Sequence, residues 1–135
     1  MVRQLQLTVI VALLVHSGFI SAGARNSMPS EERWNPQHID GLPSEVRHAI
    51  APYARICGGP LAAEHSFARY FQNGTVKLIG LHFEGLRCGN RGAVCKASGC
   101  LHQVYISRGG GPYRLLSSAY VPELDLTQIK VGPQR

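Results

Sequence analysis

The sequence predicts a small α+β domain, with one N-terminal helix packed on a mostly antiparallel sheet of four or five strands and with disulfide bonds. Three observations predict this class: a helical pattern of apolar residues early in the domain, two hairpin signals after it, and four cysteines behind an export signal. The chain has 135 residues, of which 44% are hydrophobic and 16% are charged. This composition is typical of a single folded domain and excludes a disordered chain.

Residues 1–24 have the features of a secretory signal peptide. Arg3 supplies the basic start, residues 5–20 are mostly apolar, and Ala22-Gly23-Ala24 matches a small-x-small cleavage site. We expect cleavage after Ala24 and export to the periplasm or the extracellular space. The apolar stretch is too short and too interrupted for a stable transmembrane span, so we expect no membrane span after cleavage.

The rest of the chain divides by composition into a leader, a domain and a tail. Residues 25–41 are polar and lack a clear period, which predicts a flexible leader. The domain is expected over residues 42–132, and residues 133–135 form the tail. The sequence does not indicate an oligomeric state.

A helix is predicted to begin just after Pro43. Its apolar positions follow the i, i+3, i+4, i+7 rule and are Val46, Ala49, Ile50 and Tyr53. Ser44 is the expected N-cap, because its side chain can accept a hydrogen bond from a free backbone N–H. Pro52 lacks a backbone donor, so we expect the helix to end near Ala51.

Two hairpins are predicted to follow the helix. Asn73-Gly74 is a strong signal for a tight turn, because both residues accept positive φ, and Gly109-Gly110-Gly111 marks the second turn. A helix over residues 61–70 is an alternative for the first strand. The predicted strands are residues 66–71, 75–83, 101–107, 113–121 and, as a last edge strand, 124–131.

The four cysteines, Cys57, Cys88, Cys95 and Cys100, predict two disulfides, because an even number of cysteines in an exported protein is normally paired. Three pairings are possible. We favour Cys95–Cys100, which closes a tight loop, together with Cys57–Cys88, which ties the end of the helix to the sheet. The second bond closes the longer loop and is expected to stabilise the fold by about 3–4 kcal/mol.

Other chemistry is conceivable for the histidines and cysteines. His82 and Glu84 alternate along one strand and therefore share a face, where they are suited to acid–base work, with His102 as a further member. A zinc site that combines Cys88, Cys95 and Cys100 with one of these histidines lacks the short ligand pairs of structural zinc sites. A cysteine nucleophile requires a free thiol, which the expected disulfides remove. We therefore expect no cofactor and no metal.

The excess positive charge of the chain is concentrated in one segment. Between Glu84 and Glu123 there is no acidic residue. The basic residues there are Arg87, Arg91, Lys96, Arg108 and Arg114. Such a segment suits an anionic partner. Because the protein is expected to be exported, we expect that partner to be an anionic envelope component or an acidic protein and not a nucleic acid.

The domain resembles a family of small secreted four-cysteine proteins of alphaproteobacteria. The resemblance covers residues 42–118 and rests on an ordered set of motifs: Leu42-Pro43, Val46-Arg47, Cys57-Gly58-Gly59, Cys88, Cys95, Cys100, Val104-Tyr105-Ile106-Ser107 and Tyr113-Arg114. Many relatives carry an acidic, calcium-type loop where this chain reads Phe71-Gln72-Asn73-Gly74-Thr75-Val76-Lys77, without a carboxylate. The family implies no activity, so the resemblance adds none.

Taken together, these features predict a non-enzymatic exported module that binds an anionic envelope component or a protein partner. The alternative is a small secreted hydrolase or metal-dependent enzyme that uses His82, Glu84 and His102. A shared concave site for these three side chains favours the alternative.

Overall fold

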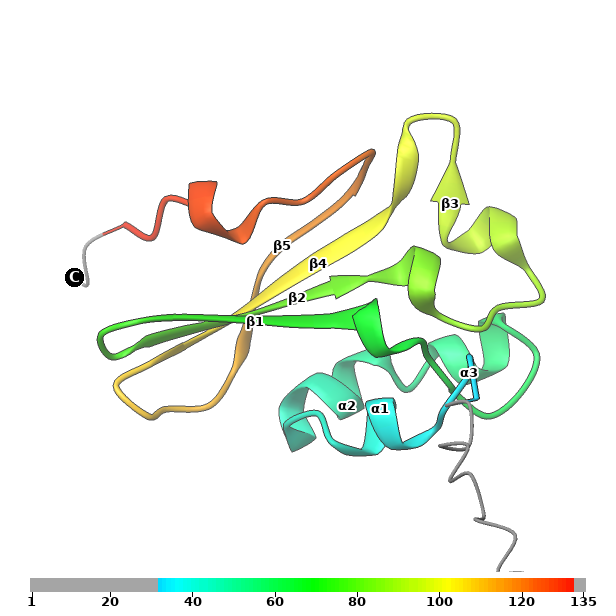
Figure 1. Cartoon of the computed structure of the whole chain (residues 1–135), viewed down its shortest axis with the longest axis horizontal. Coiled ribbons are helices and arrows are strands. Elements are labelled where there is room, and N and C mark those ends of the chain that lie inside the picture. Colours follow the sequence, from blue (N-terminus) through cyan, green and yellow to red (C-terminus); the bar gives the residue numbers. More distant parts are fainter. Residues whose placement is uncertain (1–31, 133–135) are drawn as a thin grey trace, which may run out of the picture. The chain divides into compact units, whose positions relative to one another are not determined.

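The computed structural model describes residues 32–132, so the predicted signal peptide, residues 25–31 and the tail at 133–135 lie outside the described residues. The described part contains one antiparallel sheet of five strands (Figure 1). These are β1 (Ala68–Asn73), β2 (Val76–His82), β3 (Cys95–Lys96), β4 (Gly99–Arg108) and β5 (Arg114–Val121). Along one edge β4 pairs with β2 and β3, and along the other it pairs with β5. The predicted small antiparallel sheet is therefore present.

Three short helices precede the sheet where one was predicted. They are α1 (Gln37–Asp40), α2 (Ser44–Ile50) and α3 (Tyr53–Ile56). The expected end near Ala51 is confirmed, because α2 stops at Ile50 and Pro52 is the N-cap of α3. The expected N-cap is wrong: Ser44 is the first helical residue, Pro43 precedes it, and the Ser44 hydroxyl bonds to Glu45.

The flexible leader predicted over residues 25–41 is corrected in its last part. Asn35 forms a bridge with Ala63, and α1 follows it directly. Ile39 on α1 is only 7% exposed and belongs to the main core. The burial of Ile39 and the bridge between Asn35 and Ala63 both attach this helix to the domain, so the domain begins before residue 42.

Both predicted hairpins are confirmed. In the first, Asn73 pairs with Val76, so the loop consists of Gly74 and Thr75, and Gly74 has a φ of 58°. In a two-residue turn whose first residue is glycine, that glycine has the positive φ. Asn73 is therefore not a turn residue but the last residue of β1. The second hairpin joins β4 to β5 and contains a bulge at Val104 and Tyr105. The alternative helix over residues 61–70 is absent, since only a 3-10 turn (His65–Phe67) precedes β1.

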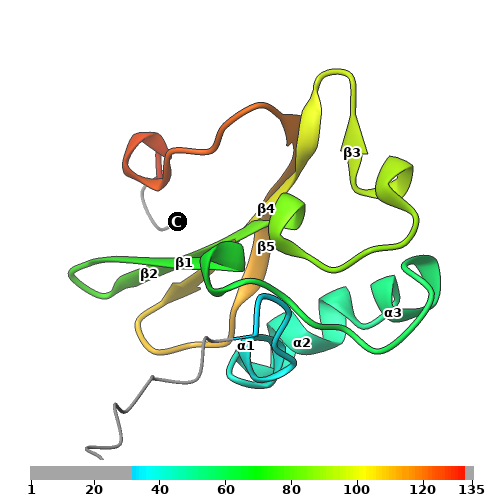
Figure 2. The same ribbon diagram turned by 45° about the vertical axis from the view of Figure 1, so that its right-hand side comes forward.

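The two faces of the sheet are covered by different elements (Figures 1 and 2). The helices lie on one face, where Val46 and Ile50 of α2 share a core with Ile79, Leu81 and other residues of the sheet. The segment after β5 crosses the opposite face and contains the 3-10 turn Leu126–Gln128. Its apolar residues pack against Leu78, Val104 and Ile106; they are Leu124, Leu126, Ile129 and Val131.

The last edge strand expected at residues 124–131 is therefore wrong. The alternation of apolar and polar residues in this segment directs one set of side chains onto the sheet face, and the segment does not pair with a strand edge. Gly80 provides the room for this contact. A Cβ at Gly80 would lie 2.9 Å from Leu126 Cδ2 and 3.1 Å from Leu124 Cδ2.

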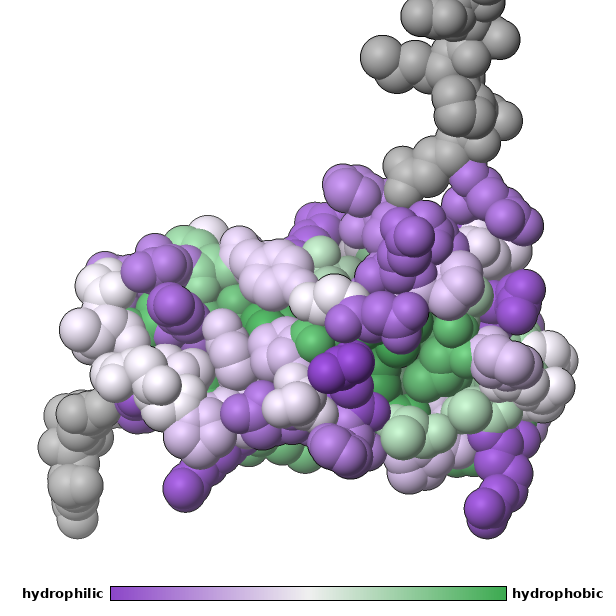
Figure 3. Space-filling model, turned by 90° about the horizontal axis from the view of Figure 1, so that it is seen from below, coloured by the Kyte–Doolittle hydropathy of each residue, from purple (hydrophilic) through white to green (hydrophobic). Residues whose placement is uncertain are grey.

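Seen from the helix side, the surface mixes hydrophilic and hydrophobic side chains, with hydrophobic ones showing between the charged groups (Figure 3). Within residues 32–132, no helix is long and apolar enough to cross a membrane.

Candidate metal centre

His82 and His102 form a cross-strand pair at one end of the sheet. His82 is the last residue of β2 and lies directly opposite His102 of β4. Their rings are perpendicular, with centroids 4.9 Å apart. Because side chains alternate along a strand, both histidines lie on the face that the C-terminal segment covers. Glu84 follows on the 3-10 turn Phe83–Gly85, which continues from β2.

The carboxylate of Glu84 reaches both imidazoles. Glu84 Oε1 is 3.7 Å from His82 Nδ1, and Glu84 Oε2 is 3.4 Å from His102 Nε2. The two histidine side chains are 8% and 2% exposed, whereas the glutamate side chain is 47% exposed. The three residues alternatively predicted for acid–base or metal chemistry therefore form one cluster, with its imidazoles buried and its carboxylate open to solvent.

The proton positions leave this cluster short of hydrogen-bond donors. His102 Nδ1 lies 2.9 Å from the carbonyl oxygen of Cys100. A carbonyl oxygen only accepts, so Nδ1 donates, and in the neutral ring Nε2 presents a lone pair to the Glu84 carboxylate. His82 Nε2 is buried without a hydrogen-bond partner. A cation placed between the Glu84 carboxylate, His82 Nδ1 and His102 Nε2 makes the contact between the lone pair of His102 and the carboxylate favourable. It does not supply a partner for His82 Nε2.

His82 is suited to bind such a cation as a neutral ligand. Burial lowers the pKa of His82 below its ordinary value of 6.5, and the nearby Glu84 carboxylate only partly opposes this effect. His82 is therefore uncharged at neutral pH. A neutral imidazole is the form of histidine that binds metal ions.

The spacing of the three groups fits a small divalent metal ion. One donor atom from each residue lies within 4.8 Å of the other two. Tetrahedral zinc, with ligand bonds of about 2.1 Å, separates its donor atoms by about 3.4 Å. The two distances from Glu84 are near this value, but they start from different oxygens: 3.7 Å from Oε1 to His82 Nδ1 and 3.4 Å from Oε2 to His102 Nε2. Two imidazoles and one carboxylate are ligands of zinc and other first-row transition metals.

Arg91 joins the two chain segments that carry this cluster. Its Nη1 donates to the carbonyl oxygens of Glu84 and Leu86, at 3.3 and 3.4 Å, and its Nη2 lies 3.3 Å from Cys95 Sγ. Cys95 is bonded to Cys100, whose carbonyl oxygen orients His102. The sequence predicts Arg91 only as part of an anion-binding face and does not predict this role. An arginine within a few residues of a candidate ligand and a cysteine was the available signal.

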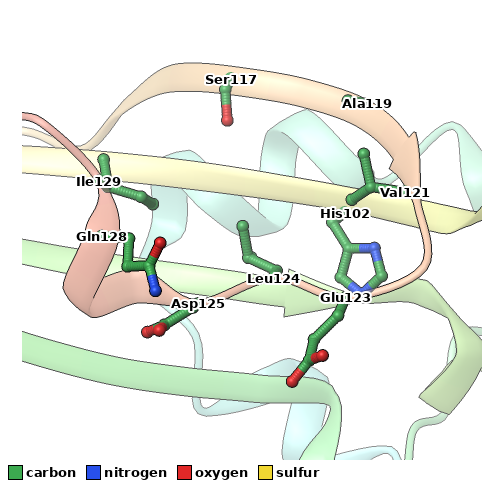
Figure 4. A pocket seen from close by; sticks show the side chains of 9 residues that line it. All are labelled: His102, Ser117, Ala119, Val121, Glu123, Leu124, Asp125, Gln128 and Ile129. Carbon is green, nitrogen blue, oxygen red and sulfur yellow. The ribbon is translucent and has the colours of Figure 1, made fainter.

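A cleft of about 610 Å³ opens beside His102, between β4, β5 and the C-terminal segment (Figure 4). Figure 4 shows His102 at one end, close to Glu123, with Gln128 and Ile129 at the other end. Ser117, Ala119 and Val121 form the β5 side. Sequence reasoning did not single out Glu123 or Asp125, because the segment that carries them was expected to be a strand at the sheet edge.

All four cysteines are paired, and the pairs are the favoured ones. Cys57 is bonded to Cys88, and Cys95 to Cys100. No cysteine is free, so neither the zinc site with cysteine ligands nor the cysteine nucleophile is present. The candidate metal ligands are histidine and glutamate side chains alone.

The five basic residues predicted to bind anions do not lie together. Arg87, Arg91 and Lys96 lie near the start of β4, where Lys96 pairs with Gly99. Arg108 ends β4 and Arg114 begins β5 at the opposite end. A ten-residue strand separates its ends by about 30 Å. One continuous anion-binding face is therefore not formed, and an anionic envelope component or acidic protein as partner stays a prediction.

The three basic residues near the start of β4, Arg87, Arg91 and Lys96, contact different partners. The Arg87 guanidinium donates to the carbonyl oxygen of Pro60 at 3.4 Å. The Lys96 ammonium lies 4.2 Å from the ring centre of Tyr120, in cation–π geometry. Together with the contacts of Arg91, these interactions give each of the three side chains a local structural role.

Comparison of the chain with protein-family models, with curated proteins and with solved structures gave no match. The resemblance to secreted four-cysteine proteins therefore stays an expectation, and the argument for function rests on the geometry of the site.

Proposed function

We propose that this chain is an exported metal-binding protein in which His82, Glu84 and His102 hold one Zn²⁺ ion. The observation that carries the proposal is the cluster itself: one donor atom from each of the three residues lies within 4.8 Å of the other two, and the Glu84 carboxylate contacts both imidazoles. In this arrangement His82 offers Nδ1, the ring nitrogen near Glu84 Oε1, and His102 offers Nε2.

The ligand set also defines the kind of metal site. Three protein ligands leave the fourth position of a tetrahedral zinc ion to water or to an exogenous group, as in zinc sites that act on substrates. A bound Zn²⁺ lowers the pKa of such a water to about 7. Glu84 is the exposed ligand, so the open position faces solvent on its side of the cluster.

The proposal places the protein outside the cytoplasm. Two disulfides are typical of oxidising compartments, and residues 1–24 carry the pattern of a cleavable signal peptide. In its finer form, the proposed fold is an α+β domain whose N-terminal helical segment packs on the sheet through α1 and α2. The two disulfides hold that segment and the metal-binding end of the sheet in place.

The test is Zn²⁺ binding by the purified, oxidised protein, measured by competition with a chromophoric chelator. We expect one ion per chain. His102→Gln and Glu84→Gln should each weaken binding by more than about tenfold, because even the partners of metal ligands contribute that much. His48→Gln is the matched control, since His48 lies exposed on α2 and bonds only to the carbonyl oxygen of Ser44.

Co²⁺ supplies a second readout, because its visible absorption is intense only in tetrahedral sites. The wild type and His48→Gln should give this spectrum, and the two ligand variants should lose it while keeping a native circular dichroism spectrum. The proposal is wrong if the wild type fails to compete with the chelator, or if the ligand variants bind Zn²⁺ as tightly as His48→Gln does.

A further inference from the structure

A second cleft, of about 410 Å³, lies away from the metal centre, between the β1–β2 hairpin and the C-terminal segment. Most of its lining is apolar and belongs to the smaller core on this face of the sheet: Phe71, Val76, Leu78, Leu126, Ile129 and Val131. Leu78 is nearly fully buried, whereas the other five are only partly buried. The cleft thus leaves apolar surface accessible along its walls. Its size is within the usual range for small-molecule sites.

One charged side chain completes the lining. Arg108 borders the cleft, and its Nη1 donates to the carbonyl oxygen of Gly132 at 3.3 Å, which leaves further N–H groups available. Arg108 also borders an adjoining hollow of about 310 Å³, which Arg114 shares. None of the described residues that line these two hollows is acidic. An apolar cleft therefore ends at two arginines without a neutralising carboxylate.

We infer that this cleft binds a free fatty carboxylate of medium chain length. The aliphatic chain lies between the β1–β2 hairpin and the C-terminal segment, and the carboxylate contacts Arg108, with Arg114 beside it. Burial of methylene groups supplies the chain-dependent part of the affinity. The guanidinium fork matches a carboxylate with two parallel hydrogen bonds. The cleft shares no residue with the metal centre, so this inference does not depend on Zn²⁺ binding.

The two adjoining hollows favour a single-chain ligand. Arg108 borders both hollows and Arg114 borders the smaller one, so the charged end of the ligand lies where the two hollows adjoin. A cationic or neutral amphiphile has the same chain but lacks the group that the arginines recognise. A short carboxylate has the group but lacks the chain.

The first experiment measures binding of hexanoate, octanoate and decanoate by calorimetry, with each ligand below its micelle concentration. A metal chelator is present throughout, so that a carboxylate bound to Zn²⁺ does not contribute. We expect affinity to rise with each added methylene, by up to about fourfold. Decanol and decylammonium should bind at least about tenfold more weakly than decanoate.

The second experiment compares variants at the charged end of the cleft. Arg108→Gln should weaken decanoate binding about tenfold, and Arg114→Gln should weaken it less. Arg55→Gln is the control, because Arg55 is an exposed residue of α3 on the other side of the sheet. Val131→Asn, on the apolar wall, should reduce the gain in affinity from octanoate to decanoate.

Three results overturn the inference: decanoate binds no more tightly than hexanoate, decanol binds as tightly as decanoate, or Arg108→Gln and Arg114→Gln both bind like Arg55→Gln. Binding to anionic phospholipid vesicles without binding to free decanoate also overturns it, because it indicates a membrane surface. A failure of Zn²⁺ binding leaves this result unchanged, since the chelator removes the metal in every measurement.

Discussion

At the scale of single residues, Arg91 links the two halves of the candidate metal centre. Glu84 lies on the turn after β2, and His102 lies on β4, eighteen positions later in the chain. Arg91 contacts the backbone of the first segment at Glu84 and the disulfide that begins the second. A guanidinium has a rigid fork of donors, so it fixes both segments at once.

Replacing Arg91 should therefore affect metal affinity without removing a ligand. We predict that Arg91→Lys weakens Zn²⁺ binding about tenfold, the smaller end of the range for residues that orient metal ligands. Lysine keeps the charge but loses the fork, so an electrostatic role alone predicts no change. Arg87→Lys is the control, because Arg87 bonds to Pro60 and not to the ligand segments. Equal affinities of the two variants in the chelator assay would contradict this role.

At the scale of elements, the C-terminal segment differs most from its predicted structure, because it packs on a face of the sheet and does not pair with a strand. Its alternating pattern predicts a strand, yet the same pattern places Leu124 and Leu126 on a sheet face without pairing. Periodicity indicates which side chains are buried, but it does not indicate whether the segment pairs with a strand or packs on a sheet face. Gly80 was the useful signal, because an isolated glycine within a strand often marks a close approach by another segment.

The Asp125 carboxyl group lies in the turn of this segment, and its pKa depends on the hydrogen bonds of that turn. Asp125 Oδ1 accepts hydrogen bonds from Thr127, from the backbone nitrogen at 2.9 Å and from the hydroxyl at 2.6 Å. These bonds lower the pKa of Asp125 below its ordinary value of 3.8. A carboxyl whose pKa is lower in the folded state stabilises the fold above its unfolded pKa. That contribution is lost as the pH falls through the folded-state pKa.

We predict that an NMR titration of the side-chain carboxyl gives Asp125 a midpoint below 3.8. Thr127→Val removes the hydroxyl donor and keeps the backbone donor, so it should move the midpoint part of the way back. Glu123, exposed two residues earlier, serves as the reference in the same spectra. An unchanged Asp125 midpoint in Thr127→Val would show that the hydroxyl bond does not contribute, and a wild-type midpoint at or above 3.8 would contradict the turn itself.

At the scale of the whole molecule, local signals predicted more than long-range ones. The end of α2 before Pro52 and the two hairpins follow from short-range rules. The strand expected to carry both His82 and Glu84 ends at His82, and Glu84 lies on the 3-10 turn that follows. The pairing of His82 with His102 does not follow from short-range rules, because residues 83–98 separate β2 from β4 and no tight turn sets their register. The same long connection carries Arg91, so its contacts also depend on the tertiary structure.

The presence of three short helices, where the sequence predicts one, also depends on contacts that local patterns do not report. The periodic apolar residues predict one helix, and the buried Val46 and Ile50 are among them. Ile39 lies outside that pattern, and its burial, together with the bridge between Asn35 and Ala63, shows that α1 belongs to the domain. A lone apolar residue in a polar stretch carries too little information to distinguish a docked turn from a leader.

The two disulfides should contribute differently to two properties: the free energy of unfolding of the whole molecule and the Zn²⁺ affinity of the metal centre. Cys57–Cys88 spans 31 positions and Cys95–Cys100 only five. Loop-closure entropy therefore predicts a loss of about 3–4 kcal/mol in the free energy of unfolding for the Cys57→Ser/Cys88→Ser pair, and about 2 kcal/mol for the Cys95→Ser/Cys100→Ser pair. Urea unfolding of the two variants and the wild type measures both values.

Zinc affinity should rank the two variants in the opposite order. The Cys95–Cys100 bond holds the strand end whose carbonyl oxygen orients His102 and whose sulfur contacts Arg91. Its loss should weaken Zn²⁺ binding, whereas loss of Cys57–Cys88 should leave the affinity of the folded fraction close to that of the wild type. The Zn²⁺ affinity of both variants is measured in dilute buffer without urea, and each variant is the control for the other. If zinc affinity simply follows the free energy of unfolding, the disulfide at β3 and β4 has no specific role in orienting the ligands.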